Sequence, residues 1–386
     1  MLLLDKPLVS QFVMNSIRRG LFPAFDTGCI VPEGELDLLG EEDAIARLTG
    51  KTGERIHTIS ENSISWIESQ DGNERLKEKI RLFKDKCAFR DLTADLYPGL
   101  FYRKVGVDQL RNLDIAEIPF PHILKPNVGF FSMGVHKLNH RDKWEPTCLK
   151  IQAEIDHIRS IYPKAVLDTA EFIIEEVIHG EEYAIDAYYG AQGEPVLVGV
   201  MHHLFGGEND VSDRVYLTSS GIINRHKEIF MDFLEKIGQR AGLKNFSLHA
   251  EVRIDEQGRL VPIEINPLRF GAWCTSADLM HYAFGINPYH LYINNIIPDW
   301  DHIRENTSED LFGIIILDNS TGIPGNRIRS FNYKKAVGMF SKVLELRPVD
   351  YRKYPIFGIL FIQTGADKLD EIQHILQDDL KKLIKF

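Results

Sequence analysis

The sequence has few of the features that mark several large classes of protein. It holds four cysteines in 386 residues, far apart and without a Cys-x-x-Cys pair, so we expect a reducing, cytoplasmic environment and no structural zinc. No apolar run is long enough to span a bilayer, and the start at Met1 lacks the length and basic flank of a signal peptide. We therefore expect no contact with a membrane.

The chain also has fewer basic residues than acidic ones, with 45 Lys and Arg against 56 Asp and Glu. The net charge of −11 at pH 7 argues against general binding to nucleic acid or anionic lipid, although it leaves room for a local basic pocket for phosphates. No Gly-x-Gly-x-x-Gly follows the first strand, where Asp-Lys-Pro-Leu-Val-Ser stands instead. A dinucleotide-binding domain, and with it an NAD-dependent dehydrogenase, therefore has no support.

A late acidic hairpin is the most informative motif that the chain does contain. Residues 249–266 read HAEVRIDEQGRLVPIEIN, in which two apolar, strand-like runs flank turn residues at 255–258. Pairing of these runs brings Glu251 close to Glu264, and side-chain alternation puts Glu264 and Asn266 on one face. Carboxylate and amide oxygens suit Mg²⁺, which takes its remaining ligands from water and phosphates. The motif predicts a nucleotide site, with solvated side chains as the alternative.

The chain divides into three segments of different pattern. Residues 1–115 alternate short strands and helices, which predicts a parallel α/β domain. Residues 116–305 hold longer apolar strands and the acidic hairpin. Residues 306–386 are expected to form a small α/β appendage. The expected fold class is α/β, with α+β character in the central segment.

Several single elements can be placed as well. We expect helices over Pro7–Gly20 and Leu76–Asp95, and a terminal helix from Lys368 to Lys385. The run EFIIEEVIHGEEYAIDAYYG at 171–190 predicts two strands joined by a tight turn.

A loop rich in glycine follows an apolar strand that ends at Lys125. Gly129 and Gly134 would let the backbone approach a ligand closely, and Ser132 adds a hydroxyl. Lys125 supplies a point charge for a phosphate. An ordinary hairpin loop is the alternative.

An acidic turn follows the apolar run FII. Residues 175–183 read EEVIHGEEY. A chain leaving a strand can offer an adenine edge one C=O and one N–H, with Glu175 near the exocyclic amine and Glu182 accepting from ribose hydroxyls. A solvated turn without a ligand is the alternative.

Taken in order, these motifs resemble the ATP-grasp superfamily over about residues 76–300. The order is a helix with Asp85-Lys86, the Lys-Pro loop, the acidic turn and the Glu…Glu-x-Asn set. The resemblance implies that residues 1–115 are a truncated form of the α/β domain that precedes the ATP-grasp domain. It also implies two lobes within 116–305, a small β-rich lobe at about 119–190 and a metal-binding lobe at about 191–305. The resemblance implies ATP with Mg²⁺, or Mn²⁺ in its place, and a choice between Lys86 and Lys84 for phosphate. The implied nucleotide ligands are Lys86, Lys125, Ser132, Gly134, Glu175, Glu176, Val177, Ile178 and Glu182, and the implied metal ligands are Glu251, Glu264 and Asn266.

The resemblance also implies a ligase that joins a carboxylate to an amine or thiol through an acyl phosphate. Its partners would be small-molecule carboxylates and amines, and the apolar C-terminal strands could form a homodimer contact. The candidate catalytic cations are Arg269 for the acyl-phosphate oxygens, Arg253, and Arg214 for a substrate carboxylate. A salt bridge to acidic ligands is the alternative, above all for Arg253.

Two further alternatives stay open at this point. The same site could use bicarbonate, as carbamoyl-phosphate synthases and carboxylases do, or the chain could bind nucleotide without catalysis. His202 and His203 could supply a general base, but adjacent histidines on a strand point to opposite faces and so make a poor zinc pair.

Overall fold

The computed structural model describes residues 1–386 except 33, 51–53, 130–133, 162–167 and 209. The N-terminal part holds a parallel sheet in the order β2–β1–β3, which confirms the expected strand–helix alternation. Its elements are β1 (Leu2–Leu4), α1 (Gln11–Arg18), β2 (Ala24–Asp26), α2 (Glu41–Thr49), β3 (His57–Thr58) and α3 (Ser63–Ser69). Helix α1 is shorter than expected because the Ser10 hydroxyl caps it, accepting the Val13 amide.

The helix expected over 76–95 is interrupted. It consists of α4 (Glu74–Lys84) and α5 (Lys86–Thr93). Asp85 lies between them with extended backbone, and its carboxylate caps α5 by accepting the Ala88 amide. Because of this break, Lys84 and Lys86 make different contacts.

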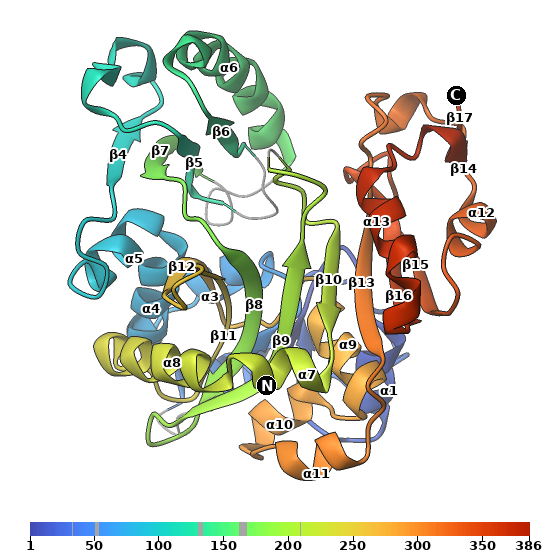
Figure 1. The fold of residues 1–386 in the computed structure, drawn as a ribbon. Helices are drawn as coiled ribbons and strands as arrows, with labels where there is room; N and C mark the ends of the chain where they lie inside the picture. Colours follow the sequence, from blue (N-terminus) through green and yellow to red (C-terminus); the bar gives the residue numbers. More distant parts are fainter. Residues whose placement is uncertain (33, 51–53, 130–133, 162–167, 209) are drawn as a thin grey trace.

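A small antiparallel sheet in the order β4–β7–β5–β6 forms a lobe of its own (Figure 1). Its apolar core includes Leu124, Trp144 and Ile174. The elements of the lobe are β4 (Tyr102–Gly106), β5 (His122–Val128), β6 (His136–Leu138), α6 (Trp144–Ile161) and β7 (Asp168–Glu176).

A larger antiparallel sheet forms the body, in the order β12–β11–β8–β9–β10–β13–β16–β15. Its strands are β8 (Glu181–Tyr189), β9 (Pro195–Leu204), β10 (Val215–Thr218), β11 (Phe246–Ile254), β12 (Leu260–Pro267), β13 (Leu311–Asp318), β15 (Val343–Pro348) and β16 (Ile356–Thr364). The helices around it are α7 (Ser220–Arg225), α8 (Lys227–Ala241), α9 (Thr275–Phe284), α10 (Pro288–Asn294) and α11 (Trp300–Glu305). No helix in the described ranges is long and apolar enough to cross a membrane.

The two strands expected at 171–190 are β7 and β8, joined by a short turn as predicted, but they do not pair with each other and belong to different sheets. Strand β7 pairs with β4 and β5, whereas β8 pairs with β9 and β11. At the junction Gly180 has φ 121°, and a Cβ there would lie 2.2 Å from the Ile254 carbonyl oxygen. Glycine thus lets the chain turn from one lobe to the other.

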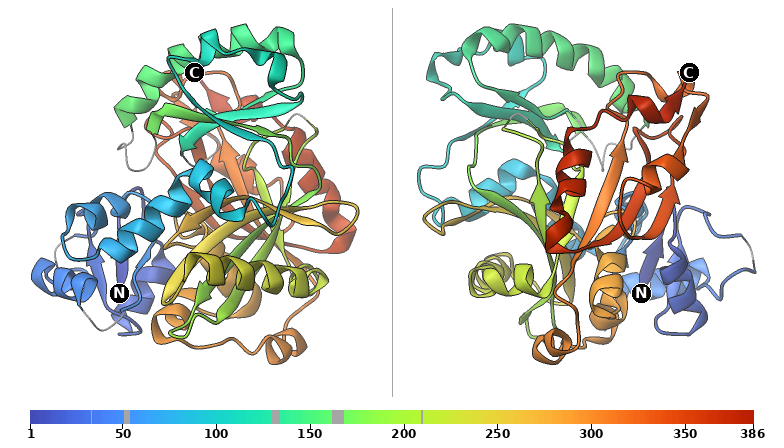
Figure 2. Two further views of the ribbon diagram at one scale, coloured as in Figure 1. Left: turned by 90° about the vertical axis from the view of Figure 1, so that its left-hand side faces the viewer. Right: turned by 45° about the vertical axis from the view of Figure 1, so that its right-hand side comes forward.

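The C-terminal segment contributes β13, β16 and β15, which extend the large sheet, and its division from the body at residue 306 stays a prediction. Figure 2 shows this segment beside the body, facing the small lobe across a gap between the ribbons. The terminal helix is also shorter than expected: α13 (Leu369–Gln377) ends before Leu380, whose φ is 58°. After it, β17 (Ile384–Lys385) pairs with β14 (Ser330–Phe331), next to α12 (Tyr333–Val337).

Candidate nucleotide and metal site

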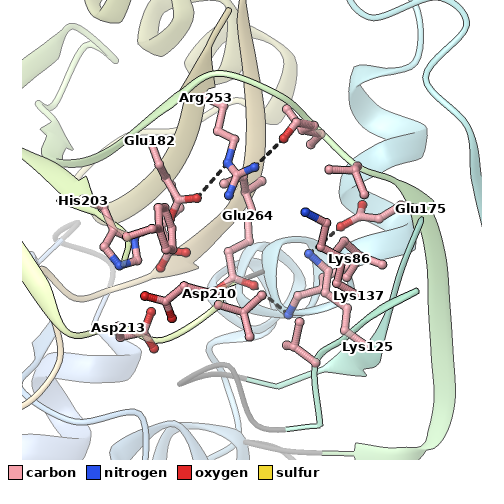
Figure 3. Close-up of a pocket in the computed structure, with 18 of the residues that line it drawn as sticks. Lys86, Lys125, Lys137, Glu175, Glu182, His203, Asp210, Asp213, Arg253 and Glu264 are labelled. Carbon is pink, nitrogen blue, oxygen red and sulfur yellow. Dashed lines mark hydrogen bonds and ion pairs between the residues drawn. The ribbon is translucent and has the colours of Figure 1, made fainter. Parts of the chain in front are cut away.

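A cavity of about 1010 Å³, including its opening to solvent, lies where the small sheet meets the large one. Figure 3 shows Lys86, Lys125 and Lys137 on one side of it together with Glu175, and Glu182, Asp210 and Asp213 on the other, with Glu264 between them. Sequence-predicted residues from both lobes meet here. Those that line the cavity are Lys86, Lys125, Glu175, Glu176, Val177, Ile178, Glu182, Glu251, Arg253 and Glu264.

The acidic hairpin has the predicted geometry. Glu251 on β11 lies opposite Glu264 on β12, with a bulge directly after Glu251. The Asn266 amide donates to Glu264 Oε1 at 3.2 Å, so these two side chains share one face as expected. The three oxygen-bearing groups thus converge at one end of the hairpin.

The pKa values of the two carboxylates are shifted in opposite directions. Burial raises the pKa of Glu251 well above its ordinary value, and the carboxylates of Glu264, Asp213 and Glu182 raise it further. Burial opposes ionisation of Glu264 as well, but the ammonium groups of Lys86 and Lys125 outweigh it and lower the pKa of Glu264. A divalent cation between these two glutamates would relieve their repulsion.

The donor set therefore fits Mg²⁺. Across the described residues, no group of three His, Cys, Asp or Glu side chains is arranged to hold a metal ion by itself. Two carboxylates and the Asn266 amide would leave coordination positions for phosphate and water, as Mg²⁺ usually requires.

Lys86, Lys125 and Lys137 line the cavity, whereas Lys84 does not. The Lys86 ammonium lies 2.8 Å from Glu264 Oε2 and donates to the Gly129 carbonyl at 3.2 Å. The Lys125 ammonium lies 2.5 Å from Glu175 Oε1. Lys84 instead forms a buried ion pair with Glu61. The structure thus places Lys86, rather than Lys84, at the cavity.

Glu175 holds cations in place. Its Oε2 accepts from Arg90 Nε at 3.0 Å and Nη2 at 2.8 Å, while Oε1 faces Lys125. Burial would raise its pKa, but Arg90 and Lys125 outweigh burial and lower the pKa to about 2. The sequence predicted that this carboxylate lies near the amine of adenine. In the structure both of its oxygens contact Arg90 or Lys125, and the adenine contact stays a prediction.

Arg90 was not predicted as a site residue. Besides Glu175, its guanidinium donates to the Pro262 carbonyl at 2.7 Å and the Ile263 carbonyl at 3.0 Å. Arg90 thereby connects the small sheet to β12 of the acidic hairpin. The signal in the sequence was its position four residues after Lys86 in one helix, which puts both side chains on the same face.

The linker between the lobes is held by Arg253. Its Nη1 donates to the Ile178 carbonyl at 2.5 Å and its Nε to Glu182 Oε2 at 2.9 Å. His203 Nδ1 lies 2.7 Å from Glu182 Oε1. Arg253 therefore orients the linker and the Glu182 carboxylate, and its catalytic role stays a prediction.

The two adjacent histidines face opposite ways, so they form no zinc pair. His203 lines the cavity, whereas His202 stacks on Tyr183 at 4.9 Å between ring centroids.

Arg214 does not line the cavity described above or the second cavity described below, which corrects its expected place in a substrate pocket. Its Nε lies 2.7 Å from Asp318 Oδ1, and its Nη1 donates to the carbonyls of Ile375 and Asp378 at 2.9 and 2.7 Å. The side chain is buried and fastens β10 to the C-terminal segment. Its neighbour Asp213 lines the nucleotide cavity instead.

Arg269 lines a second cavity, of about 660 Å³ including its opening. Asp213, Glu251 and Glu264 line both cavities, which therefore meet at the metal hairpin. The Glu61 carboxylate accepts a hydrogen bond from Arg269 Nε at 2.9 Å and so fixes the position of this guanidinium. Glu61 was also missed, because 208 residues separate it from Arg269.

The glycine-rich loop is only partly described. Gly129 lies at the cavity and Gly134 has φ 71°. Ser132 lies outside the described residues, as do its neighbours 130, 131 and 133.

The comparisons with known proteins agree with this architecture. Residues 118–277 match the family model of the ATP-grasp domain. The chain therefore carries an ATP-grasp domain, as the resemblance predicted.

Individual relatives are distant. D-alanine–D-alanine ligase from Pseudomonas entomophila is 23% identical over 153 residues, which is 39% of this chain and 43% of that protein. The chain is similar in structure to L-amino acid ligase from Bacillus licheniformis (TM-score 0.68, 14% identity, 98% and 97% of the two chains). It is also similar to carboxyaminoimidazole ribonucleotide synthase from Aspergillus clavatus (TM-score 0.64, 12% identity, 99% and 98%). At these identities the structural likeness shows the fold.

Proposed function

We propose that the protein is an ATP-dependent ligase that activates a carboxylate as an acyl phosphate and joins it to an amine or a thiol. One observation carries the proposal. Glu251 and Glu264 face each other where two cavities meet, with Lys86 and Lys125 on the side of the first. A phosphoryl group held over these side chains would stand between a nucleotide and a second substrate. The names of two similar proteins, D-alanine–D-alanine ligase and L-amino acid ligase, support a reaction of this kind.

In this proposal the first cavity binds ATP. The backbone of Glu176, Val177 and Ile178 meets the adenine edge, and the Glu182 carboxylate accepts hydrogen bonds from the ribose. Lys86 and Lys125 neutralise phosphate oxygens. On binding, the phosphates compete with Glu264 and Glu175 for the two ammonium groups, which stay in a polar environment.

Glu251, Glu264 and Asn266 would hold one or two Mg²⁺ or Mn²⁺ ions. When bound, such an ion neutralises charge on the phosphates and screens the two carboxylates from each other. The protein contributes the fixed geometry of the hairpin, which Arg90 braces through the carbonyls of Pro262 and Ile263.

The chemistry has two steps. A substrate carboxylate oxygen attacks the γ-phosphorus, so that a new P–O bond forms, the bond to the bridging oxygen breaks, and ADP leaves. The amine nitrogen then attacks the acyl carbon, the C–O bond to phosphate breaks, and the nitrogen loses a proton as the amide forms. Arg269 at the second cavity would stabilise negative charge on the acyl phosphate.

Use of bicarbonate is the less favoured alternative. Bicarbonate is small and polar, whereas the second cavity is lined by several isoleucines, a methionine and a tryptophan. The cytoplasmic location and the homodimer expected from the sequence remain proposals.

The test is ATP-dependent phosphate release with pools of carboxylates, using hydroxylamine to trap any acyl phosphate as a hydroxamate. Glu264→Gln should lower kcat at least 100-fold, because it removes a metal ligand and the partner of Lys86. Glu256→Gln, in the exposed turn of the same hairpin, is the matched control and should behave as wild type. Full activity of Glu264→Gln would refute the metal assignment, and no turnover with any carboxylate would refute the ligase proposal.

A further inference from the structure

The second cavity has a floor made by successive strands of the large sheet. Met201 on β9, Ile314 and Ile316 on β13, and Ile359 on β16 line it, and each is at most 8% exposed. Ile316 lies directly opposite Ile359 in the strand register. Tyr216 on β10 lies between β9 and β13 and also lines the floor, so the floor is largely apolar, and much of it comes from the C-terminal segment.

The wall of the cavity is a tight loop before α9. Gly271, Ala272, Trp273, Thr275 and Ser276 line the cavity. The Gly271 amide donates to the Ser276 hydroxyl at 2.5 Å, and a Cβ at Gly271 would lie 2.6 Å from that oxygen. The Trp273 ring packs edge-on against Tyr354, with 5.3 Å between centroids. This loop is thus fixed by its own contacts and gives the cavity a defined shape.

The opposite end of the cavity is charged. Glu251 and Glu264 belong to both cavities, and Arg269 stands beside them. A molecule in this cavity would have one end at the reacting phosphate and the other among isoleucine side chains. Polar groups in the apolar part would lose water without gaining partners, so the cavity selects against them.

We propose that the second cavity binds the carboxylate substrate and that this substrate is a carboxylic acid with a branched aliphatic or aromatic group. The carboxylate lies at Arg269 and the metal hairpin, and the apolar group packs on Ile314, Ile316 and Ile359. Strands β13 and β16 thereby determine specificity. This inference rests on the proposed ligase function and adds the class of its acid.

The assay is hydroxamate formation with ATP, Mg²⁺ and hydroxylamine, over a panel of acids. Leucine, phenylalanine and their counterparts without the amino group, 4-methylpentanoate and 3-phenylpropanoate, represent the proposed class. Acetate, glycine, succinate and aspartate represent small or polar acids. We expect kcat/KM for at least one apolar acid to exceed that for every small or polar acid by 10-fold or more.

Two isoleucines on one strand provide a matched pair of variants. Ile359 lines the cavity, whereas Ile362 packs in the core on the other face of β16. Ile359→Ala should lower kcat/KM for the best apolar acid about 10-fold, with an unchanged KM for ATP. Ile362→Ala should leave the ratio between apolar and small acids as in wild type. If Ile359→Ala does not fold, Ile356→Ala removes a more exposed side chain of the same cavity.

The results separate this inference from the ligase proposal. Hydroxamate formed best from small or polar acids would overturn the inference and keep the ligase. An unchanged preference in folded Ile359→Ala would also overturn it. If no acid gives hydroxamate, calorimetry with the same acids decides: saturable binding of an apolar acid that Ile359→Ala weakens supports the inference, and no binding overturns it.

Discussion

Glu175→Gln tests whether buried charge holds the two lobes in register. The substitution keeps the shape of the side chain but leaves Arg90 and Lys125 buried without their anion. The pKa of Glu175 falls from 4.5 to about 2 in the folded protein, which corresponds to roughly 3 kcal/mol of stability at neutral pH. We therefore expect the variant to lose about 3 kcal/mol in the free energy of unfolding, measured by urea denaturation at pH 7.

The pH dependence gives this prediction its sign. Because the folded pKa lies below the unfolded one, the stabilisation is complete above pH 4.5 and disappears as the pH falls toward 2. The difference in the free energy of unfolding between wild type and Glu175→Gln should become smaller as the pH falls from 4.5 toward 2. Glu171→Gln is the control, since Glu171 lies on the same strand with a half-exposed side chain, paired to Lys104 at the surface. Equal stability of the two variants at pH 7 would refute the reasoning.

Two other predictions concern single cations. Lys125→Ala should raise the Kd for ATP, measured by calorimetry, at least 10-fold, because it removes a charge-assisted contact to phosphate; Lys104→Ala, at the exposed surface of the same lobe, is its control. Normal ATP affinity in Lys125→Ala would contradict the phosphate role. Arg214→Ala should lower the free energy of unfolding by about 2 kcal/mol and leave the KM values for ATP and acid unchanged. A large rise in either KM would return Arg214 to the substrate site.

The site is held together by buried charges that come from distant parts of the chain. One network joins Arg90 on α5 to Glu175 on β7 and Lys125 on β5. A second joins Lys84 on α4 to Glu61 and Arg269. The first network includes Glu175 and Lys125, which line the first cavity, and the second includes Arg269, which lines the second cavity. These cations are therefore held in fixed positions, which would reduce the rearrangement needed in the proposed reaction.

The local pattern of the sequence determined the geometry of the acidic hairpin and the class of the domain. Alternating side chains and a short turn put Glu251 opposite Glu264, because both strands are neighbours in sequence and no distant partner decides their register. The ordered motifs also pointed correctly to an ATP-grasp domain, because each motif is local and the spacing between motifs is fixed by the chain itself.

Only the tertiary structure decided which strands share a sheet and which charges meet. Strands β7 and β8 are neighbours in sequence but pair with different partners, and β13 joins β10 across a long interval. Arg214 meets Asp318, which is 104 residues away, so no local pattern could distinguish this structural contact from a substrate contact. The second cavity has the same origin: its apolar floor exists only because strands far apart in the chain pair side by side, and side-chain periodicity does not specify such partners.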